Sequence, residues 1–353
     1  MRRWVSWTHI YAGLALSLLL FVLAVTGGAL VYKEAYWRAV YPELRIDALD
    51  LAPGAHALAI AAAEREFGET LRSVKMPEPG VGAYHLYLDD GEAFLSAVDQ
   101  HVIDRWHPRD RVMSFLFDLH AHLMAGEAGE RVGGVISLLG VLLTVTGLVL
   151  WWPARRRFAL ADLRPRDFSR RSLLVWHRSL GALMSPILLL LLLTGSGLVF
   201  SQTATALLNG LFGDRVETVA PPEAPANGVA SAPDAAMLAR VASAFPGGRM
   251  VFYYPLRAGD TVHRFRLKQP CELHPNGRSY VYLDLAGDLI EKSDACALAI
   301  GLRAAYGMYP LHAGKAGSGV YKFATFLGAL ALAGLSLSGV VVYLKKGWGM
   351  RAR

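Results

Sequence analysis

Cysteine and charge are both scarce in this chain of 353 residues. Two cysteines cannot form a disulfide-dense scaffold, so the small secreted proteins of that class are excluded. Charged residues make up 18% of the chain, against about 25% in an average soluble protein, and hydrophobic residues make up 54%. Such a composition excludes an intrinsically disordered chain. We also find no phosphate-binding P-loop, no dinucleotide-binding glycine motif and no catalytic triad in the sequence.

Four stretches are almost free of charge and are long enough to cross a membrane. They cover residues 10–32, 132–152, 173–200 and 320–344, with one basic residue near the start of the third and one near the start of the fourth. A helical span needs about 20 apolar residues. The first stretch also exceeds the apolar core of about 7–15 residues in a cleaved signal peptide, so we predict that it is a retained helix.

The positive charges are distributed unevenly between the connecting segments. Residues 1–9, 153–172 and 345–353 carry thirteen basic and two acidic residues, whereas the long connections 33–131 and 201–319 carry 21 basic and 27 acidic residues. Cytoplasmic segments of membrane proteins are enriched in lysine and arginine. We therefore predict that both termini and the 153–172 loop are cytoplasmic. The formal net charge of +7 then reflects membrane topology, and no nucleic acid partner is expected.

These features predict a mainly α membrane protein, a four-helix transmembrane bundle that carries two α+β units on its outer side. The predicted order along the chain is transmembrane helix one (1–32), first outer unit with the approach to helix two (33–131), helix two (132–152), cytoplasmic loop (153–172), helix three (173–200), second outer unit (201–319), helix four (320–344) and cytoplasmic tail (345–353).

Local patterns predict the elements of the two outer units. Helix-forming residues indicate helices at 55–67 and 234–245. Alternating apolar residues indicate strands, which are expected at 84–88, 93–98, 249–254, 263–268 and 280–285. A segment rich in proline and alanine, residues 221–233, is predicted to be a linker.

An internal repeat relates the first span to the third. One unbroken register aligns His9 with His177, Gly13 with Gly181, Ser17 with Ser185, Thr26 with Thr194, Gly27 with Gly195, Leu30 with Leu198 and Val31 with Val199. Each of these helices therefore has a histidine near its start and a Thr-Gly dipeptide near its end. We expect the two histidines to lie at matching depth near the cytoplasmic face.

A second repeat relates the second span to the fourth. The register that aligns His120 with His312 also aligns Gly147 with Gly339, while small residues before the spans align in a register about one helical turn shorter. If the segment before the second span is helical, His122 points about 200° away from His120. We therefore prefer His120 as the partner of His312, and keep His122 as the alternative.

Paired histidines at matched depth suggest a haem protein. Two imidazoles on neighbouring helices are what axial ligation of one haem iron requires. The candidate pairs are His9 with His177 and His120 with His312. Small residues that would leave room for a flat macrocycle, or let helices pack closely, are Gly13, Gly181, Gly27 and Gly195. The alternative is that each histidine is a hydrogen-bonded or snorkelling side chain at the membrane interface.

Two further features lie in the second outer unit. Cys271 and Cys296 are expected either to form one disulfide, in an oxidising compartment, or to remain two free thiols. On the predicted strand 263–268, Arg264, Arg266 and Lys268 alternate with other residues and so share one face. That basic face is either solvated or a contact for an anionic ligand.

At these histidines the sequence resembles the PepSY-associated transmembrane helix family. The motifs that carry the resemblance are residues 7–13 and 176–181 around the first pair, residues 119–126, 146–153 and 310–314 around the second pair, and residues 280–288 as a strand and turn of a PepSY unit. The resemblance extends over nearly the whole chain. It implies that the two α+β regions are PepSY-like periplasmic units.

The family includes ferric-siderophore reductases of the bacterial inner membrane. The resemblance therefore implies an oxidoreductase with two b-type haems, ligated by His9, His177, His120 and His312. Electrons would come from a cytoplasmic reductase or from quinol, and would reduce a ferric siderophore or other ferric chelate in the periplasm to release Fe(II). Two alternatives remain at this point: a haem-free accessory protein whose PepSY units bind a partner, and a haem protein that passes electrons to a different periplasmic acceptor.

Overall fold

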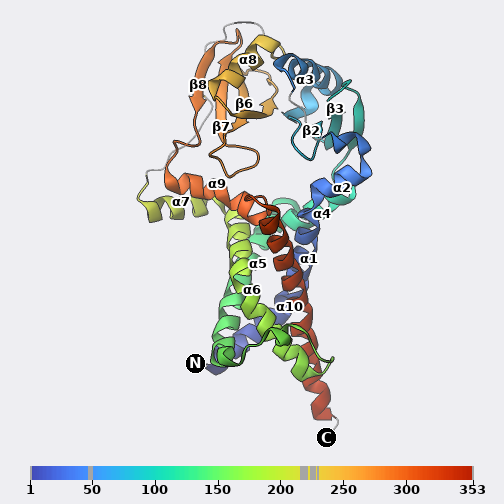
Figure 1. Ribbon diagram of the computed structural model, residues 1–353, viewed down its shortest axis with the longest axis vertical. Helices are drawn as coiled ribbons and strands as arrows, with labels where there is room; N and C mark the ends of the chain where they lie inside the picture. The colour runs from blue at the N-terminus through green and yellow to red at the C-terminus, as the bar shows by residue number, and fades with distance from the viewer. Residues whose placement is uncertain (1, 47–50, 215–221, 223–227, 229, 352–353) are drawn as a thin grey trace. The chain divides into compact units, whose positions relative to one another are not determined.

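A computed structural model describes residues 2–46, 51–214, 222, 228 and 230–351 (Figure 1). The chain divides into two compact units, each assembled from separate stretches of sequence. The described residues of 1–31, 116–204 and 308–353 form the first, here called the helical unit. Those of 32–115 and 205–307 form the second, here called the sheet unit.

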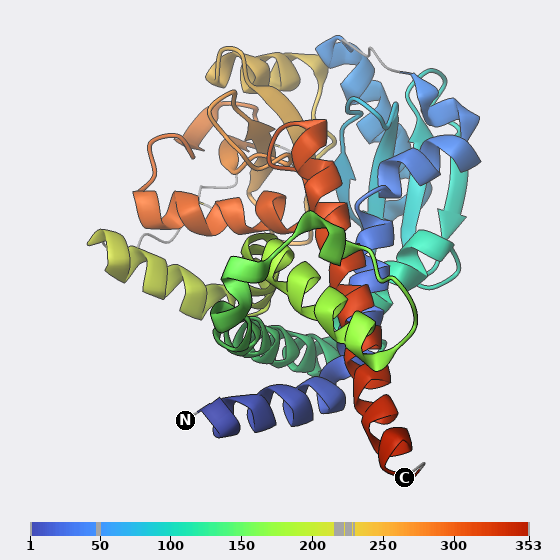
Figure 2. The ribbon, with the colours of Figure 1, turned by 60° about the horizontal axis from the view of Figure 1, so that its bottom comes forward.

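Four long helices make up most of the helical unit. They are α1 (Arg2–Leu30), α5 (Gly126–Trp151), α6 (Arg170–Val199) and α10 (Gly319–Arg351). Each covers nearly all of one predicted apolar stretch, and each is long and apolar enough to cross a membrane. The prediction of four spans is therefore confirmed. Both ends of the described chain lie at the same end of the bundle, as an even number of crossings requires (Figures 1 and 2).

The order in which these helices pack determines which side chains meet. Helix α1 packs against α5 and α10, and α6 packs against the same two helices, so α1 and α6 are diagonal to each other. The buried centre contains leucine and isoleucine from three helices: Leu20, Ile136, Leu188 and Leu192. Gly140 permits close approach there, because an added Cβ would lie 2.9 Å from Leu192 Cδ2. Residues near the bundle axis can therefore come from diagonal helices.

Two shorter helices end immediately before α5 and α10. Helix α4 (Val112–His122) is followed by Leu123 and Met124, both with positive φ (47° and 61°), a conformation that reverses the chain into α5. Gly129 packs directly under this turn, since an added Cβ would be 1.7 Å from the carbonyl oxygen of His122. Helix α9 (Ile300–His312) is followed by a turn in which Gly314 has a φ of 68°. These turns fix where the last residues of α4 and α9 lie.

Besides α9, several shorter helices were not predicted from the sequence. They are the α-helices α2 (Lys33–Val40) and α7 (Ser201–Phe212), and the short 3₁₀ segments η1 (Pro42–Arg45), η2 (Gly68–Thr70), η3 (Trp152–Arg157) and η4 (Leu160–Leu163).

The sheet unit contains one antiparallel sheet in the order β4-β3-β2-β1-β5-β6-β7-β8. Its strands are β1 (Leu71–Lys75), β2 (Ala83–Leu88), β3 (Glu92–Ser96), β4 (Val102–Trp106), β5 (Arg249–Tyr254), β6 (Val262–Lys268), β7 (Ser279–Asp284) and β8 (Leu289–Ser293). All five predicted strands are present, and β1, β4 and β8 are additional.

The two long connections form one sheet and not the two separate units that we expected. Each connection supplies four strands, but β1 pairs with β5, with Val74 opposite Tyr253 and Lys75 opposite Phe252. An unpaired strand exposes a row of backbone donors and acceptors. Pairing β1 with β5 satisfies these groups in both halves, which explains why the halves are joined.

Helices α3 (Pro53–Phe67) and α8 (Ala235–Ala244) share one hydrophobic core with the sheet, and both were predicted. Fully buried residues of this core include Ile60, Tyr84, Leu238, Tyr253 and Phe265. Helix α8 begins at a capped N-terminus, where the Asp234 side chain accepts a hydrogen bond from Met237 N at 2.8 Å. The core therefore draws on both halves of the sheet.

Cys271 and Cys296 form a disulfide in the sheet unit, so the free-thiol alternative is wrong. The bond links the segment after β6 to the segment between β8 and α9. Most of the predicted linker, residues 221–233, lies outside the described residues.

Candidate functional site

The four candidate histidines all belong to the helical unit and meet as two pairs. His9 of α1 faces His177 of α6 with ring centroids 6.3 Å apart and ring planes at 83°. His120 of α4 faces His312 of α9 with centroids 6.0 Å apart and planes at 36°. We call His9 and His177 the first pair, and His120 and His312 the second pair. The structure thus brings the histidines together in the combinations that the repeats suggest.

The two pairs lie towards opposite ends of the bundle. Along α1, the first-pair residue His9 lies near the start of the helix, and Gly27, which contacts His120, lies near its end. At a rise of about 1.5 Å per residue, these two positions are separated by about 27 Å of helix axis. Helix α6 repeats the arrangement with His177 and Gly195, the residue that contacts His312. Each diagonal helix therefore carries a first-pair histidine towards one end and a contact to the second pair towards the other.

In the first pair, each ring is held by a neighbouring helix. His9 Nδ1 lies 3.0 Å from the Thr146 hydroxyl of α5, and an added Cβ on Gly147 would be 3.1 Å from His9 Cε1. His177 Nδ1 lies 2.8 Å from the Ser338 hydroxyl of α10. An added Cβ on Gly339 would be 3.5 Å from His177 Cε1. A hydroxyl residue followed by glycine thus positions each imidazole.

In the second pair, His120 is positioned in the same way by α1. Its Nδ1 donates to the carbonyl oxygen of Leu23 at 3.0 Å and lies 3.2 Å from the Thr26 hydroxyl. An added Cβ on Gly27 would be 2.7 Å from His120 Cε1, closer than real Cβ atoms come to other atoms. The absence of a side chain at Gly27 is therefore what admits the ring.

His312 repeats this environment on α6. Its Nδ1 donates to the carbonyl oxygen of Leu191 at 2.9 Å and lies 3.4 Å from the Thr194 hydroxyl. An added Cβ on Gly195 would be 2.8 Å from His312 Cε1. The hydroxyl-glycine dipeptides that hold the four imidazoles are Thr26-Gly27, Thr146-Gly147, Thr194-Gly195 and Ser338-Gly339.

The hydrogen bonds fix which ring nitrogen carries the proton. The Thr26 and Thr194 hydroxyls donate to the carbonyl oxygens of Val22 and Leu190, at 2.7 and 2.6 Å, so towards histidine they can only accept. Nδ1 must then be the protonated nitrogen of His120 and His312. The other nitrogen, Nε2, keeps its lone pair and is free to bind a metal.

Burial keeps the second pair neutral. Burial, with a smaller contribution from the neighbouring His312, lowers the pKa of His120 to about 4. Burial also lowers the pKa of His312. Both imidazoles are therefore uncharged at neutral pH, which is the form of histidine that ligates metals.

The spacing of each pair suits two axial ligands of one metal. A metal–imidazole bond is about 2.0–2.1 Å, and the ring centre lies about 1.2 Å beyond the nitrogen, so two rings on one axis would have centres about 6.5 Å apart. The observed centroid distances are 6.3 and 6.0 Å. Within the described part of the chain, no group of three or more His, Cys, Asp or Glu residues could hold a bare metal ion. Two imidazoles at this spacing are the donor set that axial ligation of a haem iron requires.

The alternative ligand His122 lies elsewhere. Its Nδ1 lies 3.1 Å from Asp118 Oδ1 on the preceding turn of α4, and its ring packs edge-on against Phe117. The structure places His120, and not His122, beside His312.

The glycines that we singled out differ in their surroundings. Gly27 and Gly195 contact imidazoles as described, whereas Gly13 and Gly181 have room for a methyl group, with the nearest leucine atoms 3.9 and 3.6 Å from an added Cβ. Sequence reasoning missed Thr146, Gly147, Ser338 and Gly339 as partners of the first pair. The signal that could have found them is their alignment with each other in the register that aligns the second and fourth spans.

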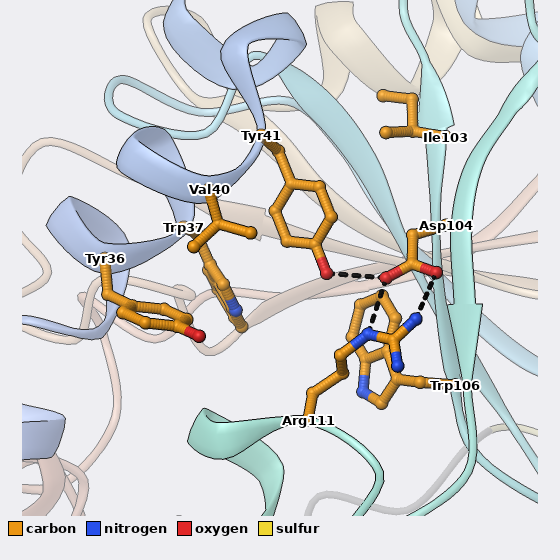
Figure 3. Close-up of a pocket in the computed structure, with 8 residues that line it drawn as sticks. All are labelled: Tyr36, Trp37, Val40, Tyr41, Ile103, Asp104, Trp106 and Arg111. Carbon is orange, nitrogen blue, oxygen red and sulfur yellow. Dashed lines mark hydrogen bonds and ion pairs between the residues drawn. The ribbon is translucent and has the colours of Figure 1, made fainter.

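The sheet unit contains a cavity of about 390 Å³, here called the aromatic pocket (Figure 3). Arg111 donates two hydrogen bonds to the Asp104 carboxylate, at 2.9 and 2.8 Å, and the Tyr41 hydroxyl donates to the same carboxylate at 2.5 Å. Burial and the contact with Asp104 raise the pKa of Tyr41 to about 12. The charge of Arg111 is therefore neutralised by Asp104, and the Tyr41 hydroxyl completes the hydrogen bonds of that carboxylate. The residues that line it are Tyr36, Trp37, Val40, Tyr41, Ile103, Asp104, Trp106 and Arg111.

The basic face predicted on strand β6 is only partly a solvent-exposed surface. Arg266 is buried and donates from Nε and Nη2 to the carbonyl oxygen of Gly277, at 2.9 and 2.6 Å. Arg264 stacks on the ring of Tyr254, with 3.9 Å between the guanidinium carbon and the ring centroid. The two arginines therefore lie among aromatic rings of the sheet.

Comparison with known families supports the relationship that the histidine motifs suggest. The model of the family described as PepSY-associated TM region matches residues 6–346, which include all four paired histidines and most of each long helix. A search of curated proteins gave no match. Because the family match extends over nearly the whole chain, this protein is a membrane protein of the PepSY-associated TM region family.

Proposed function

We propose that this chain is a transmembrane electron carrier that binds two haems b and reduces a ferric chelate outside the cytoplasm. The observation that supports the proposal is the meeting of two histidine pairs near opposite ends of an apolar bundle, at 6.3 and 6.0 Å between ring centroids. His9 and His177 would hold one haem iron, and His120 and His312 the other. Bound haem would supply one-electron redox chemistry, with a potential tuned by its axial ligands and burial.

The residues of the chain contribute orientation and proton placement. Each hydroxyl-glycine dipeptide keeps one imidazole in a fixed position, and the acceptor at Nδ1 leaves Nε2 as the nitrogen that would bind the iron. A hydrogen bond at Nδ1 also raises the basicity of the ligating nitrogen. The apolar side chains around the bundle axis, such as Leu188 and Leu192, exclude water from the path between the pairs.

The proposed orientation follows from the charges of the connecting segments. Residues 1–9, 153–172 and 345–353 hold thirteen basic residues against two acidic ones, which favours a cytoplasmic location for these segments. In a bacterial inner membrane the first pair would then be nearer the cytoplasm and the second pair nearer the periplasm, and the connections 33–131 and 201–319 would be periplasmic. Electrons would travel outward, across a hydrocarbon layer of about 30 Å.

The proposed reaction transfers one electron to Fe(III) held by a siderophore or another chelator. Fe(III) becomes Fe(II), which oxygen ligands hold far more weakly, so the metal is released for uptake. The electron comes from a cytoplasmic reductase or from a quinol, and one quinol oxidised to quinone supplies two electrons and releases two protons. Covalent catalysis is not needed, which fits a chain whose sequence has no catalytic triad.

A visible spectrum of the full-length protein purified in mild detergent tests the proposal. We expect b-type absorption in the oxidised and dithionite-reduced states, and about two haems per chain. The reduced protein should then be reoxidised by a ferric hydroxamate chelate but not by the gallium(III) complex of the same chelator, which has the same shape and cannot accept an electron.

Two results would contradict the proposal. A colourless protein from cells supplied with haem would exclude haem binding and favour the accessory-protein alternative. A protein with b-type spectra that the ferric chelate cannot reoxidise would be an electron carrier to another acceptor.

A further inference from the structure

A second cavity in the sheet unit, of about 370 Å³, is here called the disulfide cavity. It lies between the segment that follows β6 and the first two turns of α9, and the Cys271–Cys296 bond forms part of its wall. Its volume is in the range of small-molecule sites, about 300–1,000 Å³. The residues that line it are Cys271, Glu272, Leu273, His274, Arg278, Ala295, Cys296, Ile300, Arg303, Ala304, Tyr306 and Gly307.

The central polar group of the cavity is the guanidinium of Arg278. It lies over the ring of Tyr306, with 4.9 Å between its carbon and the ring centroid, and its Nη2 is 3.3 Å from His274 Nε2. Its Nε is buried and has no hydrogen-bond partner among the described residues. Burial and the positive charge of nearby Arg266 lower the pKa of Arg278. The guanidinium is thus held in an unfavourable environment for a cation.

The carboxylates near Arg278 are already engaged with other groups. Glu272 Oε1 accepts from Gln269 N and from the Ser279 hydroxyl, both at 2.9 Å, and its Oε2 accepts from the backbone N–H of Arg278. Asp294 Oδ1 accepts from Gln269 Nε2 at 2.6 Å and from Cys296 N at 2.8 Å. Within the described ranges, Arg278 forms no ion pair with a carboxylate. A half-buried cation without a counter-ion is in a less favourable environment than one in water.

In the aromatic pocket, by contrast, the charge of an arginine is neutralised by a carboxylate. There, Arg111 binds both oxygens of Asp104 (Figure 3). In the disulfide cavity, Arg278 and the exposed Arg303 face a space whose one carboxylate, Glu272, is used to hold backbone groups. The counter-ion that Asp104 provides in the aromatic pocket is therefore missing from the side chains that line the disulfide cavity.

We propose that the disulfide cavity binds an organic anion, whose carboxylate pairs with Arg278 and whose apolar body packs against Tyr306 and the disulfide. The walls of the cavity favour such a ligand over a bare inorganic anion, because Leu273, Ala295 and Ala304 provide apolar surface beside the guanidinium. Arg303 also lines the cavity, where its positive charge attracts an anion. This site uses no haem-pair residue, so it does not depend on the proposed electron transfer.

Calorimetric titration of the full-length protein in detergent tests the proposal. Benzoate is the probe, benzamide is its neutral counterpart of the same shape, and sulfate is the inorganic anion. We expect benzoate to bind measurably and both other compounds to bind about tenfold or more weakly, as the loss of a charge-assisted hydrogen bond or of apolar contact implies. Equal binding of benzamide, or of sulfate, would overturn the assignment to an organic anion.

Variants locate the binding site and separate binding from folding. Arg278→Gln should weaken benzoate binding about tenfold or more, whereas Arg264→Gln, which alters an arginine that stacks on Tyr254 outside the cavity, should not. Benzoate should raise the thermal unfolding midpoint of the wild-type protein and of Arg264→Gln, but not that of Arg278→Gln.

The ligand-free Arg278→Gln protein should be as stable as wild type, because the substitution removes a half-buried charge that lacks a counter-ion. A large loss of stability, or unchanged benzoate binding, would show that Arg278 has a structural role instead. Benzoate should also bind His9→Ala normally. That result keeps this site distinguishable from the haem proposal if either one fails.

Discussion

The two histidine pairs have the same kinds of partner, a hydroxyl residue and a glycine, but the contact distances differ. First-pair histidines belong to long helices, and added Cβ atoms on their glycines would be 3.1 and 3.5 Å from the rings. Second-pair histidines lie at or near the ends of the short helices α4 and α9, and the corresponding distances are 2.7 and 2.8 Å. The hydroxyl contacts show the opposite trend, at 3.0 and 2.8 Å for the first pair and 3.2 and 3.4 Å for the second.

This difference indicates how each pair is held in place. A long helix fixes the position of its histidine by itself, and the partner hydroxyl adds a close contact at Nδ1. A histidine beside a chain reversal needs a close-fitting surface, and the bare backbone of Gly27 or Gly195 provides it. The comparison predicts that the first pair is more sensitive to loss of a hydroxyl, and the second pair to added volume at glycine.

On the proposed function, the largest expected effect is loss of one of two haems when a paired histidine is removed. His9→Ala should abolish the first site and leave about half of the bound haem, because the second pair is formed by different helices. His312→Ala should abolish the second site and leave only the spectrum of the haem at the first site. Pyridine haemochrome assays and reduced-minus-oxidised spectra measure both results. Full haem content in both variants would refute the assignment of the pairs.

The next effect distinguishes the glycines. Gly27→Ala should displace His120 and deplete haem from the second pair, because the new methyl group would lie 2.7 Å from the ring. Gly339→Ala is the matched control, since its methyl group would meet His177 at an ordinary contact distance of 3.5 Å. Haem-to-protein ratios check this pair of variants. Equal losses in both would mean that the glycine contacts do not differ between the pairs.

A smaller effect concerns the hydroxyls. Thr146→Val removes an acceptor from the Nδ1 of His9, lowers the basicity of the ligating nitrogen and should raise the midpoint potential of the first haem. A hydrogen bond of about 1 kcal/mol corresponds to roughly 40 mV for a one-electron couple. Thr194→Val, where the contact is 3.4 Å long, should shift the second haem less. Thr146→Ser keeps the hydroxyl and should restore the wild-type potential.

The smallest expected effect is that of His122→Ala. His122 contacts Asp118 within α4, an interaction worth about 0.3–0.5 kcal/mol on a helix surface. Haem content, spectra and midpoint potentials should therefore equal those of the wild type. Loss of one haem in this variant, with full haem content in His120→Ala, would show that His122 and not His120 is the partner of His312.

The sequence predicted the elements that depend on local patterns. Four apolar runs gave α1, α5, α6 and α10, and the repeat between the first and third spans gave the match between His9 and His177. The contact of His9 with Thr146 joins residues 137 positions apart and depends on α5 being next to α1 in the bundle. No local pattern contains that information.

The sheet was harder to predict for two physical reasons. Strand β8 is exposed along most of its length and has no alternation of apolar and polar residues. The pairing of β1 with β5 joins residues that are far apart in the sequence. Each long connection has enough predicted strands to form a sheet of its own, so its sequence does not show that the two are joined. Hence the individual strands could be predicted better than their assembly.

The pairing of β1 with β5 has a consequence for biosynthesis. Residues 76–248, which include α5 and α6, separate the two strands, so the ribosome must complete two more membrane helices before β1 can pair with β5. Until then the half-built sheet presents an open edge, which can pair with a strand of another nascent chain. Truncation after α6 would make this state permanent. We expect such shortened chains to aggregate or to be degraded, even though they retain three complete transmembrane segments.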